Sequence, residues 1–292
     1  MNEEVKIDKR LARRAFDRAA QSYDEAAILQ REVNLRLLER FDDINFVPES
    51  ILDIGAGTGF ATYALHKRFP KANVTALDIA ESMLAVAKSR LSIMSKLKKK
   101  IIFVNAEAEC LPFADNSMDL IYSNLTLQWV SSLDAALQEC RRVLKPGGML
   151  LFSTFGPDTL KELRHSWQAV DQYSHVNDFI DMHDVGDAMM RAQFAEPVMD
   201  VENFTLTYSD VYKLMHDLKA IGAHNVTSQR AKGLTGKTHF KQLEQHYETF
   251  RQHGVLPASY EVVYGHAWLP VQELTNHKTD VGIPFDSIKP GE

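Results

Sequence analysis

The fold of this chain is decided by the stretch Ser50-Ile51-Leu52-Asp53-Ile54-Gly55-Ala56-Gly57-Thr58-Gly59. An apolar run contains a carboxylate near its end, three glycines follow at alternate positions, and a helix-like run begins at Phe60. This order predicts a buried parallel strand, a tight loop and a helix N-terminus. Glycine adopts positive φ easily and lets a ligand approach bare backbone, so the loop is a candidate binding site.

The glycine spacing and the neighbouring charges distinguish between possible ligands. The loop follows G-x-G-x-G, whereas the dinucleotide fingerprint is G-x-G-x-x-G, and no G-K-[ST] follows as in a P-loop. Asp53 would repel a pyrophosphate but attract an ammonium group. A second carboxylate, Asp78, ends the next apolar run, where an acidic side chain can bind both hydroxyls of a ribose. An ammonium group, a ribose and no phosphate describe S-adenosylmethionine.

Three further segments, residues 101–113, 118–124 and 142–148, follow in the order found in class I S-adenosylmethionine-dependent methyltransferases. The chain resembles this family over residues 51–154. The resemblance implies an α/β fold, with a Rossmann-like seven-stranded sheet, helices on both faces, an N-terminal helical lid and a helical insertion. Asn105 replaces the family's usual acid, and its amide can still pair with the adenine edge. The cofactor-binding residues that the resemblance implies are Tyr23, Gln30, Asp53, Gly55, Gly57, Gly59, Asp78, Ile79, Met83, Asn105, Ala106, Glu107 and Asn124.

The hydrophobic periodicity predicts how the elements are arranged along the chain. Strands and helices alternate over residues 46–155, which indicates a parallel sheet covered on both faces. We predict helices over 8–20, 26–41, 158–170, 184–192, 210–221 and 238–253, with strands over 197–206 and 259–264. This divides the chain into a helical lid (1–45), the cofactor-binding core (46–155), substrate-side helices and closing strands of the same domain (156–270) and a polar tail (271–292).

The composition excludes several classes of protein. The chain has 292 residues, of which 45% are hydrophobic and 25% charged, as in ordinary globular proteins. The net charge of −6 argues against nucleic-acid binding, and no apolar run could span a membrane. The N-terminus resembles neither a signal nor a transit peptide, and the two cysteines suit a reducing compartment, so we expect a cytoplasmic protein. The eleven histidines form no metal-binding motif, so we expect no metal.

A narrower resemblance extends beyond the cofactor motifs. Residues 14–20, 123–129, 155–163, 218–223 and 264–268 are similar to the malonyl-acyl-carrier-protein O-methyltransferases of biotin synthesis. This implies methyl transfer to the free carboxylate of a malonyl thioester, carried by acyl-carrier protein or by coenzyme A. The ester hides a charge, so that fatty-acid enzymes can elongate the chain toward pimelate.

This chemistry requires alignment rather than proton transfer. A carboxylate has a reference pKa of about 4 and is already ionised, so it attacks a sulfonium methyl without a general base. We therefore expect no catalytic acid or base, but a cation that holds the substrate carboxylate. Arginine suits this role because its guanidinium binds a carboxylate bidentately. The candidate substrate contacts are Tyr23, Arg31, Trp129 and Arg164.

A set of basic side chains in the first predicted helix is a candidate docking surface. Arg10, Arg13, Arg14 and Arg18 recur at helical spacing and would form one ridge. An acidic carrier protein would be attracted to such a ridge even though the whole enzyme is negative.

Two other functions stay open on the sequence. Residues 155–164 and 255–260 also resemble a mitochondrial complex I assembly factor, which hydroxylates an arginine and shares the methyltransferase fold. A methyltransferase for a free small diacid would need no carrier-protein surface. The match at residues 264–268 and the lack of a transit peptide favour the malonyl ester.

Overall fold

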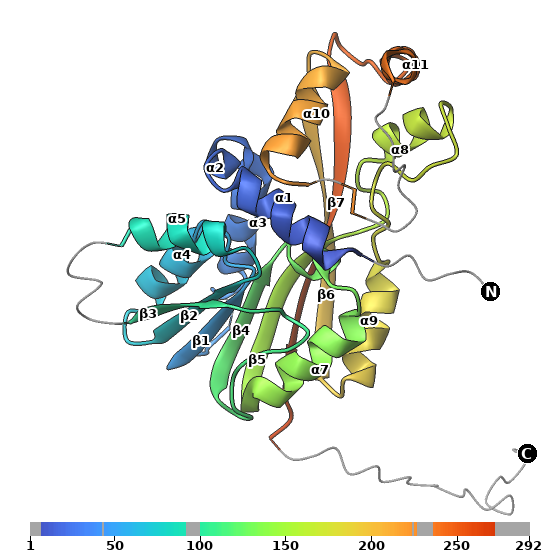
Figure 1. Cartoon of the computed structure of the whole chain (residues 1–292). Coiled ribbons are helices and arrows are strands. Elements are labelled where there is room, and N and C mark those ends of the chain that lie inside the picture. The colour runs from blue at the N-terminus through green and yellow to red at the C-terminus, as the bar shows by residue number, and fades with distance from the viewer. Residues whose placement is uncertain (1–6, 43, 92–99, 224, 227–235, 272–292) are drawn as a thin grey trace, which may run out of the picture.

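The structure is a computed structural model that describes residues 7–42, 44–91, 100–223, 225–226 and 236–271. Its centre is a seven-stranded sheet of order β3-β2-β1-β4-β5-β7-β6 (Figure 1). Strands β1 to β5 are parallel, whereas β7 runs antiparallel to both β5 and β6. This confirms the predicted Rossmann-like sheet. The strands are β1 Ser50–Ile54, β2 Asn73–Asp78, β3 Ile101–Asn105, β4 Met118–Asn124, β5 Leu144–Phe155, β6 Ala195–Tyr208 and β7 Leu256–Trp268.

Helices cover both faces of the sheet, because successive strand side chains point to opposite faces. Ile51 of β1 lies in one buried cluster with Val33 and Leu37, whereas the next residue, Leu52, lies in a second cluster with Leu137. The first face is covered by α3 (Ile28–Glu39), α4 (Phe60–Arg68) and α5 (Glu81–Ser89), and the second by α7 (Leu133–Val143) and α9 (Met182–Arg191).

Three N-terminal helices stand where the lid was predicted. They are α1 (Lys9–Ala19), α2 (Tyr23–Ala26) and α3. The predicted helix over 26–41 begins only at Ile28, because Ala27 has the non-helical dihedral angles φ −81° and ψ 43°. Helix α1 packs beside α5, where the Asp17 carboxylate accepts a hydrogen bond of 3.0 Å from the backbone N–H of Ser82. This contact joins α1 to the first turn of α5.

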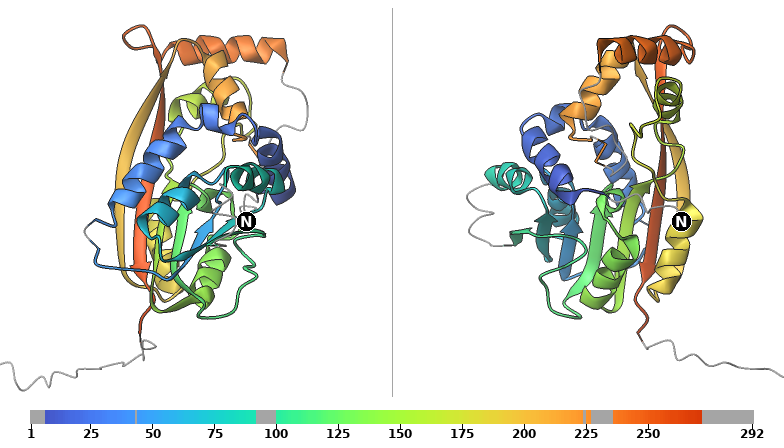
Figure 2. Two further views of the ribbon diagram at one scale, coloured as in Figure 1. Left: turned by 90° about the vertical axis from the view of Figure 1, so that its left-hand side faces the viewer. Right: turned by 45° about the vertical axis from the view of Figure 1, so that its right-hand side comes forward.

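The substrate-side elements lie around two long strands. Strands β6 and β7 are longer than predicted, and Figure 2 shows them extending beyond the other strands toward α10 (Val211–Ala220) and α11 (Lys237–Glu248). Helix α8 (Lys161–Gln168) packs against β7 and α11. Helix α11 ends at Glu248 rather than at residue 253, because the chain turns through Gly254 (φ +82°). The predicted tail is 271–292, and all of it after Val271 lies outside the described residues.

The stretch Lys145-Pro146-Gly147-Gly148 is part of β5. The pairing with β4 shifts there, since Met118 is opposite Leu144 while Leu120 is opposite Met149. Gly147 has φ +78°, so the extra residues form an irregularity at the start of the strand.

Candidate active site

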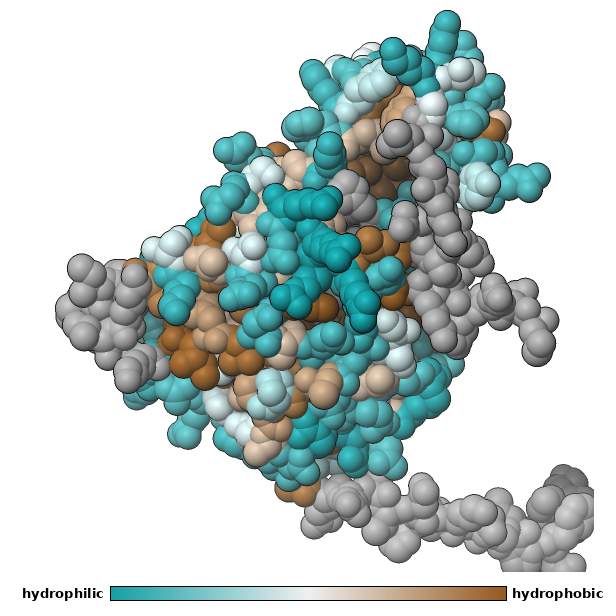
Figure 3. Space-filling view, in the orientation of Figure 1, coloured by the Kyte–Doolittle hydropathy of each residue, from teal (hydrophilic) through white to brown (hydrophobic). Residues whose placement is uncertain are grey.

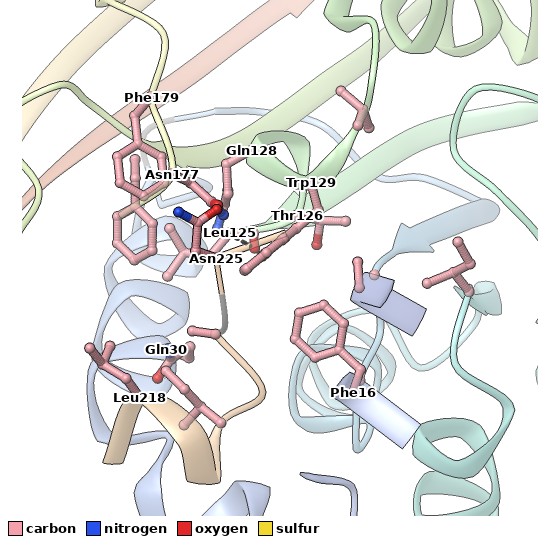
Figure 4. Close-up of a pocket in the computed structure, with 18 of the residues that line it drawn as sticks. Phe16, Gln30, Leu125, Thr126, Gln128, Trp129, Asn177, Phe179, Leu218 and Asn225 are labelled. Carbon is pink, nitrogen blue, oxygen red and sulfur yellow. Dashed lines mark hydrogen bonds between the residues drawn. The ribbon is translucent and has the colours of Figure 1, made fainter. Parts of the chain in front are cut away.

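A cavity of about 380 Å³ lies at the edge of the sheet where the parallel strands end. It is lined from below by the residues that end β1, β2, β4 and β5, and from above by α1, α2, α10 and the segment 175–179. Ligands of open α/β sheets bind at this edge. Figure 4 shows that the lining side chains come from elements far apart in the sequence, among them Phe16, Gln30, Trp129 and Asn225.

The glycine loop lines this cavity, and its glycines have different structural roles. A Cβ on Gly57 (φ +53°) would meet no atom within 4 Å, so this position faces open space in the cavity. A Cβ on Gly55 would lie 1.9 Å from Oγ1 of Thr126, so Gly55 is required by packing. Gly59 does not line the cavity but begins α4 with φ +89°. Gly57 is therefore the position where a ligand can approach the backbone.

The two predicted carboxylates lie in different places. Asp78 lines the cavity, and its carboxylate accepts hydrogen bonds from the N–H groups of Gly57 (2.8 Å) and Ala80 (2.7 Å). Burial raises the pKa of Asp78 to about 6. Asp53 does not line the cavity, since it is 1% exposed and accepts a bond of 2.6 Å from the Thr62 hydroxyl. Burial raises the pKa of Asp53 to about 7. Direct contact with a ligand is thus available to Asp78, whereas Asp53 lies behind the loop.

Asn105 is also placed differently from the prediction. Its Nδ2 donates to the backbone carbonyls of Asp78 (2.8 Å) and Ile79 (2.9 Å), and it does not line the cavity. The amide therefore fixes the turn after β2 instead of facing an adenine. The other predicted cofactor residues in this region, Ile79, Met83, Ala106 and Glu107, all line the cavity.

Gln30 and Asn124 meet at the centre of the cavity. Asn124 is fixed at both ends of its amide, because Nδ2 donates to the Gln30 carbonyl (3.1 Å) and Oδ1 accepts from the Ser153 hydroxyl (2.9 Å). By contrast, the side-chain Oε1 of Gln30 is buried and has no hydrogen-bond partner among the described residues. A buried acceptor without a donor lowers the stability of the folded protein, so Oε1 of Gln30 is available to a ligand that donates a hydrogen bond.

Aromatic side chains close the lid side of the cavity. Tyr23 and Trp129 both line it, and the Trp129 ring meets Phe16 of α1 edge-on, with centroids 5.1 Å apart. Burial raises the pKa of the Tyr23 hydroxyl, so this group is neutral. Lys9 of α1 also lines the cavity and bridges Glu107 (2.7 Å) and Glu109. The lid is thereby held to the loop after β3.

The two arginines predicted to bind the substrate do not line the cavity. The Arg164 guanidinium donates to the carbonyls of Pro157 (2.8 Å), Thr159 (3.4 Å) and Asn177 (3.4 Å). It therefore fixes the backbone around the cavity. Arg31 lies on α3, and its side chain is likewise absent from the cavity wall.

Several cavity residues on irregular segments are not among the candidates that the sequence suggested. Leu125 (φ +49°) and Leu160 (φ +55°) line the cavity, and such strained non-glycine residues are common at functional sites. His175 also lines it, with its ring stacked on Trp167 at 3.7 Å and its Nε2 at 2.9 Å from the Asp171 carboxylate. Leu125 and Leu160 lie in the family-like segments 123–129 and 155–163, which gave them no site role, whereas His175 lies outside every such segment and only the tertiary fold brings it to the cavity. The other cavity residues of this kind include Gln128, Asn177 and Asn225.

The chain is similar to known methyltransferases in sequence. A family model described as a methyltransferase domain matches residues 52–152. A malonyl-[acyl-carrier protein] O-methyltransferase from Gallionella capsiferriformans is 53% identical over 92% of this chain and 93% of its own length. The chain belongs to the malonyl-[acyl-carrier protein] O-methyltransferase family. Another member, malonyl-[acyl-carrier protein] O-methyltransferase 1 from Coxiella burnetii, is 45% identical over 98% of this chain and 97% of its own length.

Solved structures confirm the fold of this malonyl-[acyl-carrier protein] O-methyltransferase family member. The YcgJ protein from Bacillus subtilis matches with a TM-score of 0.56 and 20% identity, covering 80% of this chain and 97% of that protein. Phosphoethanolamine N-methyltransferase 2 from Haemonchus contortus, solved in complex with S-adenosyl-L-methionine, matches with a TM-score of 0.55 and 20% identity over 87% of this chain and 57% of that protein.

The described residues contain no cluster of three or more His, Cys, Asp or Glu side chains that could hold a metal ion. Within the same ranges, no helix is both long and apolar enough to cross a membrane. A cytoplasmic location stays a prediction from the sequence.

Proposed function

We propose that this chain transfers the methyl group of S-adenosylmethionine to the free carboxylate of malonyl-acyl-carrier protein. The observation that carries the proposal is the similarity of nearly the whole chain to enzymes of that name, at 45% to 53% identity for the two relatives above. The cavity supports it, because a glycine loop with Asp78 and an apolar second half lie on either side of Asn124.

The residues of the first half fit the cofactor. Gly57 leaves its backbone open, Asp78 offers a carboxylate to ribose hydroxyls, and the unpaired Oε1 of Gln30 can accept from an ammonium group. When bound, S-adenosylmethionine supplies a methyl group activated by the positive charge on its sulfur. Tyr23, Phe16 and the other side chains of the lid exclude water from this half.

The residues of the second half have to orient a carboxylate and strip it of water. Phe155, Leu163, Phe179 and Leu218 line this half with apolar surface. An ionised carboxylate is the nucleophile, so no side chain has to remove a proton. Removing water from the carboxylate and aligning it with the methyl group are the contributions left to the protein.

The exposed face of α1 is our proposed docking surface for the carrier protein. Arg10, Arg14 and Arg18 are exposed and form no ion pair with a described residue, while Arg13 lies 3.8 Å from Asp17. Figure 3 shows strongly hydrophilic side chains gathered over α1, between more hydrophobic areas. Since α1 also lines the cavity through Ala12 and Phe16, a carrier protein docked there could deliver its malonyl group.

The test is an assay with radiolabelled S-adenosylmethionine against malonyl-acyl-carrier protein, malonyl-coenzyme A, free malonate and acetyl-acyl-carrier protein. We expect a base-labile methyl ester on the malonyl thioesters and no transfer to the acetyl thioester, which lacks the carboxylate. Methylation of free malonate alone would favour the diacid alternative. Hydroxylation of a peptidyl arginine without methyl transfer would favour the assembly-factor alternative.

A further inference from the structure

We infer that the malonyl carboxylate is held by the neutral side-chain amide of Asn177 rather than by an arginine. This rests on the proposed function and assigns its substrate-binding residue. Asn177 is 6% exposed and lines the cavity beside Phe179, on a segment that the sequence motifs do not mark (Figure 4).

The direction of the Asn177 amide is fixed by the backbone. Its Oδ1 accepts a hydrogen bond of 3.3 Å from the N–H of Val226, so the NH2 group is the end left for a ligand. No described residue accepts a hydrogen bond from Nδ2, and this atom is not one of the buried polar atoms that lack a partner. Because Asn177 lines the cavity, we place this NH2 group at the cavity wall as a donor. A ligand that accepts hydrogen bonds, such as a carboxylate, complements it.

Other polar groups of the cavity wall already form hydrogen bonds or ion pairs within the protein. Nδ2 of Asn124 donates to the Gln30 carbonyl, and Nε2 of Gln128 donates to the Leu125 carbonyl (2.7 Å). Lys9 is bound to two glutamates. Lys219 lines the rim of the cavity but is exposed, so water competes for its ammonium group.

The backbone of Asn177 is supported by the arginine that the sequence suggested as the clamp. The Arg164 guanidinium donates hydrogen bonds to the Asn177 carbonyl and to the Pro157 carbonyl. His175 on the same segment is fixed by Trp167 and Asp171. Arg164 is thus a positioning residue, and the amide of Asn177 is the group that meets the substrate.

A neutral donor suits methyl transfer better than a cation. A bidentate guanidinium would stabilise the carboxylate before reaction and reduce its nucleophilicity, since only interactions that are stronger in the transition state accelerate the reaction. An amide orients the carboxylate through a hydrogen bond and leaves its charge to be neutralised by the sulfonium.

The experiment compares malonyl- and acetyl-acyl-carrier protein as ligands of the cofactor-bound enzyme. Asn177→Asp keeps the oxygen that accepts from Val226 and replaces only the NH2 group, so it is nearly isosteric. We expect it to weaken malonyl binding and kcat/KM by about ten- to a hundredfold, the range for a lost hydrogen bond to a charged group, while acetyl binding and cofactor affinity stay as in the wild type. Asn177→Ala should show the same loss of malonyl preference.

Three outcomes overturn the inference. One is an unchanged preference for malonyl over acetyl in Asn177→Asp; another is an equal loss on both ligands. A third is that Lys219→Met abolishes the preference while Asn177→Asp keeps it. If Asn177→Asp fails to bind cofactor, the preference of Asn177→Ala for malonyl over acetyl decides between these outcomes. A wild-type enzyme that methylates no malonyl thioester refutes the proposed function itself, and this result is separate from all of these.

Discussion

Replacing Gln30 by leucine should change stability and cofactor affinity in opposite directions. The side-chain Oε1 of Gln30 is buried without a hydrogen-bond partner, and an unsatisfied buried polar group costs about 1–3 kcal/mol. Leucine has a similar volume and no polar atom, and the backbone carbonyl that accepts from Asn124 is kept. The ligand-free Gln30→Leu protein should therefore be as stable as the wild type or more stable, by up to about 1 kcal/mol, or about 2–4 °C in melting temperature.

The same substitution should weaken S-adenosylmethionine binding. A hydrogen bond between Oε1 and a charged ammonium group contributes about 1.5–3 kcal/mol, which corresponds to about a ten- to hundredfold rise in Kd. Calorimetric titration measures the affinity, and thermal unfolding without cofactor measures the stability.

Gln128→Leu is the matched control, because this amide is bonded at both ends. Its Nε2 donates to the Leu125 carbonyl (2.7 Å), and its Oε1 accepts from the Thr154 hydroxyl (3.3 Å). The identical substitution leaves two buried groups unpaired, so it should lower the melting temperature. A Gln30→Leu protein that is destabilised as much as Gln128→Leu, or that binds cofactor normally, would refute the role assigned to Gln30.

Three further predictions concern the loop, the buried carboxylates and the basic ridge. Gly57→Val should cost about 1–2 kcal/mol in stability because φ is +53°, and should abolish cofactor binding because its side chain fills the cavity; normal calorimetric binding would place the ligand elsewhere. Burial raises the pKa of Asp53 to about 7 and that of Asp78 to about 6, from 3.8. The folded state therefore favours the protonated carboxyl groups. The stability that this preference contributes is complete below about pH 4 and is lost as the pH rises through 6 to 7. In thermal unfolding without cofactor, the melting temperature of Asp53→Asn relative to that of the wild type should therefore rise between pH 5 and pH 8. A difference in melting temperature that does not depend on pH would contradict this. Replacing Arg10 and Arg14 by glutamate should raise KM for malonyl-acyl-carrier protein at low salt, less at high salt, and little for malonyl-coenzyme A; equal effects on both substrates would exclude a docking role.

The half of the cavity that we propose for the cofactor was predictable because its residues follow strand ends. Residues at the carboxyl ends of parallel strands meet at one edge, so the sequence positions of Asp78 and Gly57 predict where they lie. Asn105 also follows a strand end, but a position in sequence does not show whether its side chain faces the cavity or the neighbouring turn. Its amide is instead bonded to the carbonyls of Asp78 and Ile79.

The substrate half could not be predicted, because long-range contacts form it. The sequence neighbours of Arg164 suggest a substrate contact, but its guanidinium donates hydrogen bonds to nearby backbone carbonyls. Asn177 and Asn225 come together through bonds from Val226 to Asn177 and from Asn225 to Ser174 (2.6 Å), across about fifty residues of sequence. No local pattern encodes such a pairing, and the neutral amides involved are not residues that charge-based reasoning selects.

The strand order has a consequence for synthesis of the chain. The last strand, β7, lies between β5 and β6, and β6 has no other neighbour in the sheet. Sixty residues separate Tyr208, where β6 ends, from Trp268, where β7 ends, so at about 5–20 residues per second β6 waits about 3–12 s for its partner. Through that interval the growing chain carries an unpaired strand of 14 residues, a template for aggregation. Tyr260 of β7 is part of the cavity wall, so the active site is completed only at this late stage of translation.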